Sequence, residues 1–279
     1  RIASRDPCGV FLGQERANFM TQDTWAYVTC NAGRVEYSIF DTRNNHIAHG
    51  AVVLSEFGPH APKDVLSSLD VSYALLDGSF AGQRVTCPAS LAAPIEIGGQ
   101  FARMARFVDN SAPDQCFAHT AALGAFVADH AKWDGIVIFA GPVTTWANVS
   151  AGELVSFRSS LALKIACDVI KDLGLVAPEK VGDPFNDAVS SGLSKPESVF
   201  SKLCATSENE TYLGHVLGAD LAAFRSYWLG QEIVILGKGD EAHWIEAALK
   251  LQFAMVRRDT QDYFGRGARA VRAHVLGAT

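Results

Sequence analysis

The segment Trp25-Ala-Tyr-Val-Thr-Cys-Asn-Ala-Gly-Arg-Val-Glu-Tyr-Ser-Ile-Phe40 decides the fold class of this chain. Its first half predicts a strand, Asn31-Ala-Gly33 predicts a tight turn, and Val35–Phe40, in which polar and apolar residues alternate, predicts a second strand. A third strand is expected at His46–Leu54. This opening indicates a β-meander and argues against a dinucleotide-binding fold, in which a glycine loop and a helix follow the first strand.

The rest of the chain alternates between strand and helix patterns, and helices dominate its second half. The expected strands are 71–76, 135–140, 231–236 and 253–256, and the expected helices are 62–69, 120–132, 152–171, 184–192, 197–203, 212–228, 242–252 and 265–274. This order predicts an α/β fold in which mixed sheets are flanked by helices in two lobes. We place the N-terminal lobe at residues 20–140 and the C-terminal lobe at 141–279, with residues 1–19 as an extension outside the fold.

Composition narrows the function classes. The chain has 279 residues, 48% of them hydrophobic and 19% charged, and a formal net charge of −6 at pH 7. The acidic balance without a basic tract argues against nucleic acid or a membrane surface as a partner. No apolar run reaches the roughly 18–20 residues that a membrane span needs. The six cysteines form no Cys-x-x-Cys pair, which favours reduced thiols and a cytoplasmic location.

The order of elements resembles the sugar kinase/heat-shock-protein/actin superfamily, and the second half is similar to the 2-dehydro-3-deoxygalactonokinase family. The resemblance is carried by Ala151-Gly-Glu-Leu154, Phe185-Asn-Asp-Ala-Val-Ser-Ser-Gly192, Phe200-Ser-Lys-Leu203, Tyr212-Leu-Gly-His-Val-Leu-Gly-Ala-Asp-Leu221 and Ile233-Val-Ile-Leu-Gly237. It implies a two-lobed actin-like ATPase fold. It also implies phosphorylation of a keto-deoxy sugar acid, with ATP and Mg²⁺ as cofactors if the protein is active.

The resemblance implies a first nucleotide turn at Asn31-Ala-Gly-Arg-Val35, where the family typically has Asp-Trp-Gly-Ser-Thr. Gly33 is retained, but Asn31 replaces the aspartate and has no carboxylate for Mg²⁺. We expect Asn31 and Gly33 to contact the cofactor. Arg34 is able to bind a phosphate, although a solvated hairpin arginine is its more ordinary role.

Two more turns are implied at the nucleotide. Ala140-Gly-Pro-Val-Thr-Thr-Trp146 keeps the glycine and tryptophan of the family pattern Pro-Gly-Thr-His-Ser-Lys-Trp but lacks its histidine and lysine. The implied cofactor contacts in this turn are Gly141, Thr144 and Thr145. Gly237-Lys-Gly-Asp240 resembles the family's adenosine turn, where the implied contacts are Gly237 and Gly239. The strand pair that usually follows the tryptophan is expected to be missing, because Ala147–Ala151 lead directly into the expected 152–171 helix.

The resemblance also implies candidate substrate and catalytic residues. Gly78-Ser-Phe-Ala-Gly82 matches the family's substrate loop in its glycines, so Gly78, Ser79 and Gly82 are the implied substrate contacts. The two glutamates of the family's carboxylate segment are absent from Cys116–Ala122. His119 lies near the position that one of them would occupy.

The weak catalytic candidates are His119, Glu153 and Asp187, and each also has an ordinary structural role open to it. His119 would be a loop histidine, Glu153 a carboxylate at a helix start, and Asp187 a packing or ion-pair residue. No metal-ligand motif is present.

These losses predict a sugar-acid kinase relative that is catalytically impaired or inactive, because each positioned acid or base is worth about 10²–10⁴-fold in rate. An active kinase with an altered site, using ATP and Mg²⁺, is one alternative. A binding or complex-subunit protein without a cofactor is another, and a binding module outside this superfamily would have no two-lobed cleft. The expected partners are a small-molecule sugar acid or nucleotide, with a protein partner or a homo-oligomer as further alternatives.

Overall fold

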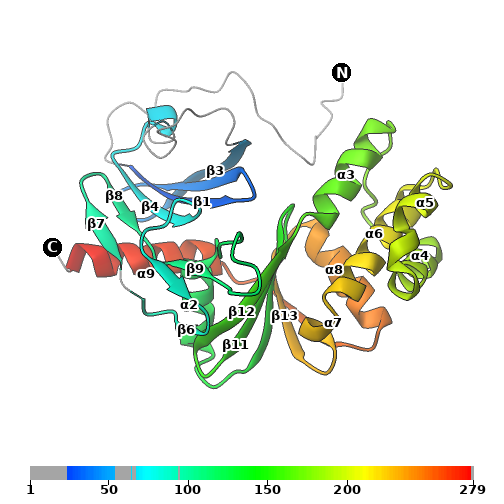
Figure 1. Ribbon diagram of the computed structural model, residues 1–279. Coiled ribbons are helices and arrows are strands. Elements are labelled where there is room, and N and C mark those ends of the chain that lie inside the picture. Colours follow the sequence, from blue (N-terminus) through cyan, green and yellow to red (C-terminus); the bar gives the residue numbers. More distant parts are fainter. Residues whose placement is uncertain (1–23, 54–63, 65–66, 94, 278–279) are drawn as a thin grey trace.

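The computed structural model describes residues 24–53, 64, 67–93 and 95–277. The extension expected at residues 1–19 lies outside these residues, as do residues 62, 63, 65 and 66 of the helix expected at 62–69. Two six-stranded mixed sheets and the helices around them make up the described chain (Figure 1). Within the described residues, no helix combines the length and the hydropathy needed to cross a membrane.

The first sheet has the strand order β3-β2-β1-β4-β8-β7. Its strands are β1 (Trp25–Asn31), β2 (Arg34–Phe40), β3 (His46–Val53), β4 (Tyr73–Gly78), β7 (Glu96–Gly98) and β8 (Phe101–Arg103). The predicted meander is confirmed, because β1 pairs with β2 and β2 with β3 in antiparallel fashion. Ala32 and Gly33 have φ angles of 49° and 76°, the positive values that a tight two-residue hairpin turn requires.

The second sheet has the strand order β14-β13-β10-β11-β12-β6. Its strands are β6 (Ala89–Ser90), β10 (Gly135–Phe139), β11 (Thr144–Ser150), β12 (Glu153–Ser160), β13 (Glu232–Leu236) and β14 (Met255–Asp259), while β5 (Arg84–Thr86) and β9 (Arg106–Val108) form a separate pair.

Both sheets follow one plan. In each, three strands form an antiparallel meander, and two further strands lie parallel beside the first strand of that meander. The meander is β1-β2-β3 in the first sheet and β10-β11-β12 in the second, with β4 and β8 matching β13 and β14. The chain therefore carries a duplicated strand order, which sets two similar hairpins facing the space between the lobes.

The helices occupy two places. They are α2 (Thr120–Asp129), α3 (Ala162–Asp172), α4 (Asp183–Ser194), the 3₁₀ turn η2 (Pro196–Ser198), α5 (Val199–Leu203), α6 (Asn209–Ala223), α7 (Arg225–Trp228), α8 (Asp240–Leu251) and α9 (Tyr263–Gly277). Helices α3–α8 gather on the outer side of the second sheet, whereas α2 and α9 lie between the sheets (Figure 1). Phe126 of α2 shares a core with Phe139 of β10, and Ala268 of α9 shares one with Trp25 of β1. The division of lobes at residue 140 stays a prediction.

The expected 152–171 helix is wrong over its first half. Its residues up to Ser160 form β12, which pairs with β11 through a turn at Ala151 and Gly152, where φ is 50° and 77°. A β-bulge interrupts this pairing, so Val155 has no partner across the ladder. The bulge brings Leu154 and Phe157, three residues apart, onto the same buried face. This spacing imitates a helix.

The hairpin that was expected to be missing is therefore present. It is the β11–β12 pair, and Trp146 lies inside β11 rather than before a helix. The α-helical part of the segment begins only at Ala162, where Leu163, Ala166 and Ile170 form the buried face of α3.

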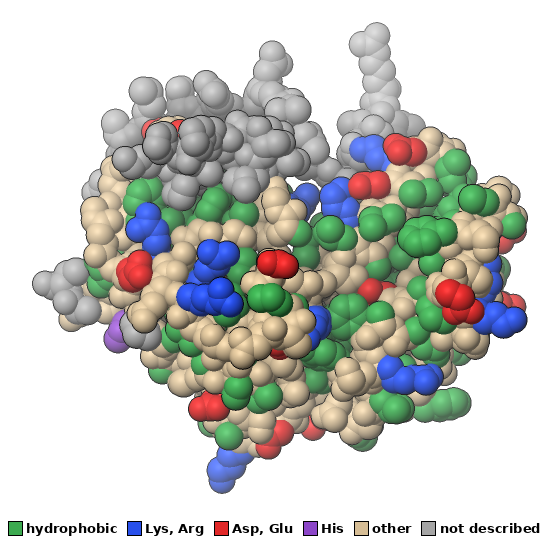
Figure 2. Space-filling model, viewed as in Figure 1, with side chains coloured by type: hydrophobic (Ala, Val, Ile, Leu, Met, Phe, Trp, Pro, Cys, Tyr) green, Lys and Arg blue, Asp and Glu red, His purple; other side chains and the backbone are tan. Residues whose placement is uncertain are grey.

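Charged side chains of both signs are interspersed on the face seen in Figure 2. This mixed distribution agrees with the modest net charge of −6 and with the absence of a basic tract from the sequence.

A buried carboxyl group makes the stability of the second lobe depend on pH. The hydroxyl of Ser160 donates a hydrogen bond of 2.6 Å to Asp220 of α6, but burial raises the pKa of Asp220 from 3.8 to about 6. Between these two values the folded protein binds more protons than the unfolded chain, so the free energy of unfolding falls as pH rises through about 6.

Replacing Asp220 with asparagine is expected to remove this pH dependence and to raise the free energy of unfolding at pH 7 by about 1–3 kcal/mol. Asparagine keeps an oxygen acceptor for Ser160 and carries no charge to desolvate. Urea unfolding of both proteins at pH 4 and pH 7 measures the difference. A variant that loses as much stability between these pH values as the parent protein would contradict the assignment.

Candidate functional site

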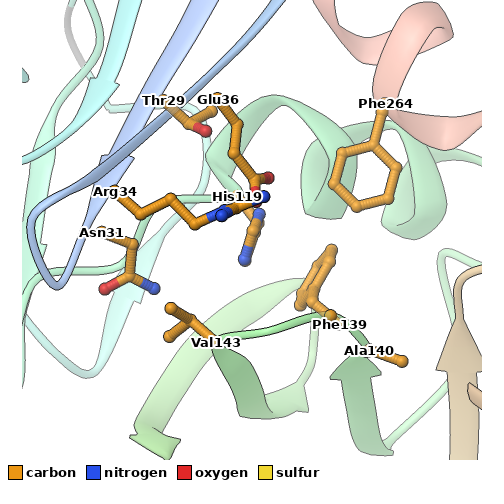
Figure 3. A pocket seen from close by; sticks show the side chains of 10 residues that line it. Thr29, Asn31, Arg34, Glu36, His119, Phe139, Ala140, Val143 and Phe264 are labelled. Carbon is orange, nitrogen blue, oxygen red and sulfur yellow. The ribbon is translucent and has the colours of Figure 1, made fainter. Parts of the chain in front are cut away.

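A cavity of about 50 Å³ lies between the two lobes. The β1–β2 hairpin, the residue before α2, the end of β10 with its following turn, and the start of α9 contribute its walls (Figure 3). The lining residues are Thr29, Asn31, Arg34, Glu36, His119, Phe139, Ala140, Gly141, Val143 and Phe264. The fold thus brings three of the sequence-derived candidates, Asn31, Gly141 and His119, into one site.

The two hairpins meet directly across this cavity. The amide nitrogen of Asn31, at the end of β1, lies 3.5 Å from the hydroxyl oxygen of Thr145 on β11 and donates a hydrogen bond to it. Gly33 is needed for the turn itself, because its φ of 76° is one that residues with a side chain rarely adopt. It is not among the residues that line the cavity.

The two threonines expected to hold a phosphate are engaged within the protein. The Thr144 hydroxyl donates to the carbonyl of Gly141 at 3.2 Å, and the Thr145 hydroxyl lies 2.9 Å from that of Ser159. Both threonine residues are buried. The hydroxyl groups of Thr144 and Thr145 therefore bond within the protein. The turn at Gly141 contributes its backbone to the cavity wall.

The charged group that faces the cavity is an ion pair on β2. The guanidinium Nε of Arg34 lies 2.9 Å from a carboxylate oxygen of Glu36, and the two side chains are 34% and 45% exposed. Residues 34 and 36 lie on the same face of β2 because side chains alternate along a strand. Figure 3 shows both extending toward the middle of the cavity.

His119 lines the cavity together with the aromatic residues Phe139 and Phe264. Its ring stacks on Phe139 with centroids 4.4 Å apart and meets Phe264 edge to face at 5.7 Å. Neither ring nitrogen has a hydrogen-bond partner, and the residue is 8% exposed. Burial lowers the pKa of His119 from 6.5 to about 3, so the ring is uncharged at neutral pH.

Asp77 of β4 holds the start of α2 against the first sheet. Its fully buried carboxylate accepts hydrogen bonds from the Tyr27 hydroxyl at 2.7 Å, from the backbone N–H of Gly78, and from both the backbone N–H and the hydroxyl of Thr120 at 2.8 and 2.9 Å. Burial raises the pKa of Asp77. Thr120 directly follows His119, so the carboxylate of Asp77 also fixes the position of His119 at the cavity.

The turn that the resemblance implies for adenosine, residues 237–239, lies beside the cavity. The predicted strand–turn–helix is confirmed, because Gly237 follows β13 and Gly239 caps α8. Gly237 packs against Ala140, whose N–H donates to the carbonyl of Leu236 at 3.0 Å. Neither glycine lines the cavity.

The implied substrate loop is used for packing. Gly78 sits against the backbone of Cys30 with no room for a side chain, and the N–H of Ser79 donates to the Cys30 carbonyl at 2.8 Å. The N–H of Gly82 donates to the Met104 carbonyl at 2.9 Å. None of the three implied contacts lines the cavity.

Two catalytic candidates lie elsewhere. Glu153 is the exposed first residue of β12 and not the start of a helix, so the reasoning from a helix dipole is wrong for it. Asp187 lies on α4, on the outer side of the second lobe. Of the three candidates, only His119 lines the cavity.

The cavity also holds residues that the sequence argument missed. Glu36 is the most important, because it is the cavity's carboxylate. The alternation of Val35–Phe40 gives a signal for it, since Glu36 has to face the opposite side from the buried Val35. Phe139 and Phe264 carry no local signal, because they are far apart in the chain and meet only in the folded protein.

The cavity does not fit Mg²⁺ and a nucleotide as it stands. Sites for drug-sized ligands are typically about 300–1,000 Å³, compared with about 50 Å³ here. Its carboxylate is already paired with a guanidinium, which repels a divalent cation. Among the residues described in the structure, no three histidine, cysteine, aspartate or glutamate side chains are grouped to hold a metal ion.

This duplicated, two-lobed architecture is the actin-like ATPase and sugar-kinase fold. A protein from Sinorhizobium meliloti assigned as a 2-dehydro-3-deoxygalactonokinase superposes with a TM-score of 0.69 at 15% identity, with 90% of this chain and 96% of that chain covered. An activator of 2-hydroxyisocaproyl-CoA dehydratase from Clostridium difficile, with bound ADPNP, has a TM-score of 0.47 at 10% identity, with 91% and 97% covered. No protein-family model and no curated protein sequence matches the chain.

Proposed function

We propose that this chain is a binding protein on a sugar-kinase scaffold, which takes the carboxylate of a sugar acid into the cleft between its lobes and transfers no phosphoryl group at a useful rate. The observation that carries the proposal is the Arg34–Glu36 pair, in which a guanidinium already engages the carboxylate that lines the cavity. Phosphoryl transfer depends on metal ions and on a group that orients the nucleophile.

His119 does not supply the missing base. A general base works best when its pKa lies near the operating pH, and burial lowers that of His119 to about 3. The cleft retains binding groups instead: a guanidinium from Arg34, an amide from Asn31 and a small aromatic wall. A guanidinium is well suited to a carboxylate, so a sugar acid is the ligand class that we favour. The protein with TM-score 0.69 carries the assignment of a kinase for such a substrate, which supports this choice.

Calorimetry with a panel of keto-deoxy sugar acids tests binding, and two variants at Gly141 sharpen it. A Cβ at this position would meet no atom closer than 4.0 Å, so a side chain there points into open space. Gly141→Asp puts a negative charge in the cleft and is expected to weaken sugar-acid binding at least tenfold, whereas the neutral Gly141→Asn keeps more of it. Absence of binding at high micromolar concentration, or equal losses in the two variants, would contradict the proposal.

An active kinase with an altered site is the second candidate, and Glu36 is the observation that favours it. Its carboxylate lines the cleft and would accept the proton of the attacking hydroxyl group. On this hypothesis Glu36→Gln abolishes ADP release that depends on a sugar acid. On the proposed function there is no such release to abolish.

A further inference from the structure

The ion pair in the cleft occupies the strongest anion-binding group of the site. Glu36 contacts Arg34 at Nε, 2.9 Å away, and both side chains extend into the cavity (Figure 3). Because both are about one-third to one-half exposed, the pair is hydrated and screened, and pairs of this kind are weak. An incoming anion of good geometry is therefore able to exchange with the Glu36 carboxylate.

A second observation points to a ligand in the same cavity. Both ring nitrogens of His119 are buried without a hydrogen-bond partner. Buried polar atoms in folded proteins nearly always have one, and leaving them unpaired is costly. The ring is held in place by Phe139 and Phe264 and lines the same cavity as Arg34, so a ligand bound at Arg34 lies beside the ring and is placed to supply the missing partner.

We propose that Glu36 is a built-in competitor for the ligand of this cleft: its carboxylate occupies Arg34 until a compact oxyanion displaces it, and the His119 ring supplies the second contact. The inference rests on the proposed function in so far as the cleft is a binding site. It adds the groups that select the ligand and the internal contact that limits its affinity.

The chemistry of these groups defines the ligand. A neutral imidazole has one N–H donor and one acceptor nitrogen, which point away from each other. A compact ligand therefore meets one of them, and the acceptor nitrogen takes a hydrogen bond from an oxyanion that also carries a hydroxyl group. Hydrogen phosphate and small hydroxy acids share this chemistry and match a cavity of about 50 Å³. Sulfate has the same shape as hydrogen phosphate but carries no proton to donate.

Calorimetric titration with inorganic phosphate tests the competitor. Glu36→Gln is expected to bind phosphate about five- to tenfold more tightly than the parent protein, because the rival carboxylate and its charge are gone. Adding Arg34→Gln to that variant is expected to remove the gain. Equal phosphate affinity in the parent and in Glu36→Gln, or tight binding that survives loss of Arg34, would overturn the proposal. Both positions are partly exposed, and thermal unfolding verifies that each variant is folded.

His119→Phe tests the second contact, because phenylalanine keeps the ring stacking and removes both nitrogens. The parent protein is expected to bind hydrogen phosphate several-fold more tightly than sulfate, and the variant is expected to bind the two equally. A preference that persists in His119→Phe would rule out the histidine contact. A parallel titration with glycerate, a hydroxy acid, shows by its affinity relative to phosphate which source of oxyanion the cleft prefers.

These outcomes are separable from the fate of the proposed function. Turnover of ATP by the parent protein would refute the binding-protein assignment and leave the effect of Glu36→Gln on phosphate affinity unchanged. Conversely, a Glu36→Gln variant without tighter binding refutes the competitor even if the protein transfers no phosphoryl group.

Discussion

Replacing Asp77 with alanine is expected to lower the free energy of unfolding by about 3–5 kcal/mol. Its carboxylate is fully buried and accepts four hydrogen bonds, from Tyr27, from Gly78 and twice from Thr120. Alanine leaves all of these donors in an environment that water does not reach. Urea unfolding measures the loss, and a change below about 1 kcal/mol would contradict the role given to this residue.

Asp77→Asn is the matched control for size. It keeps one oxygen acceptor but turns an amide N–H₂ toward groups that are themselves donors, so we expect a smaller loss of about 1–3 kcal/mol. The same ranking is expected for ligand binding, because the Thr120 contacts fix the start of α2 and the adjacent His119. An asparagine variant that is less stable than the alanine variant would show that the hydrogen bonds are not what matters.

Replacing Gly218 with valine is expected to cost about 3 kcal/mol or more of unfolding free energy. Helices α4 and α6 cross so closely that a Cβ on Gly218 would overlap the carbonyl oxygen of Val189 and come within 2.8 Å of the Leu193 nitrogen. Gly214, one turn earlier on α6, is equally close to α4. A side chain at Gly218 forces the helices apart and opens the core that they cover. Thermal or urea unfolding measures the loss.

Gly124 supplies the contrast that isolates crowding from helix propensity. It also lies inside a helix, α2, but a Cβ there would meet no atom within 4 Å. Gly124→Ala is therefore expected to stabilise the protein by about 0.5–1 kcal/mol, whereas Gly218→Ala is expected to destabilise it. Equal effects at the two positions would refute the close crossing of α4 and α6.

Much of the fold follows from local patterns. The alternation after the Asn31-Ala-Gly33 turn predicts the meander, and the buried strand at 135–140 and the strand–turn–helix at Gly237 are both found. At residues 153–160, where the local pattern predicts a helix instead of a strand, one extra residue is responsible. The bulge at Val155 gives Leu154 and Phe157 a helical spacing within a strand, and no pairing partner is visible in a sequence window.

The site is harder to predict because its parts come from distant segments. Asn31 and Thr145 are 114 residues apart in the chain and bond to each other. The resemblance indicates that glycine turns matter there, and Asn31 and Gly141 do line the cavity. The resemblance does not predict Glu36, because it places the expected carboxylates in another segment, Cys116–Ala122. Whether His119 has a ligand partner depends on the aromatic groups packed around it, which only the folded chain brings together.

The central claim, a cleft that binds without transferring phosphoryl groups, is tested most directly by a coupled ADP-release assay with ATP, Mg²⁺ and keto-deoxy sugar acids at saturating concentrations. We expect the parent protein to release ADP no faster than Gly141→Asp, with or without a sugar acid. Release that depends on a sugar acid and is lost in both Gly141→Asp and Glu36→Gln would contradict the account and identify Glu36 as part of an active kinase site.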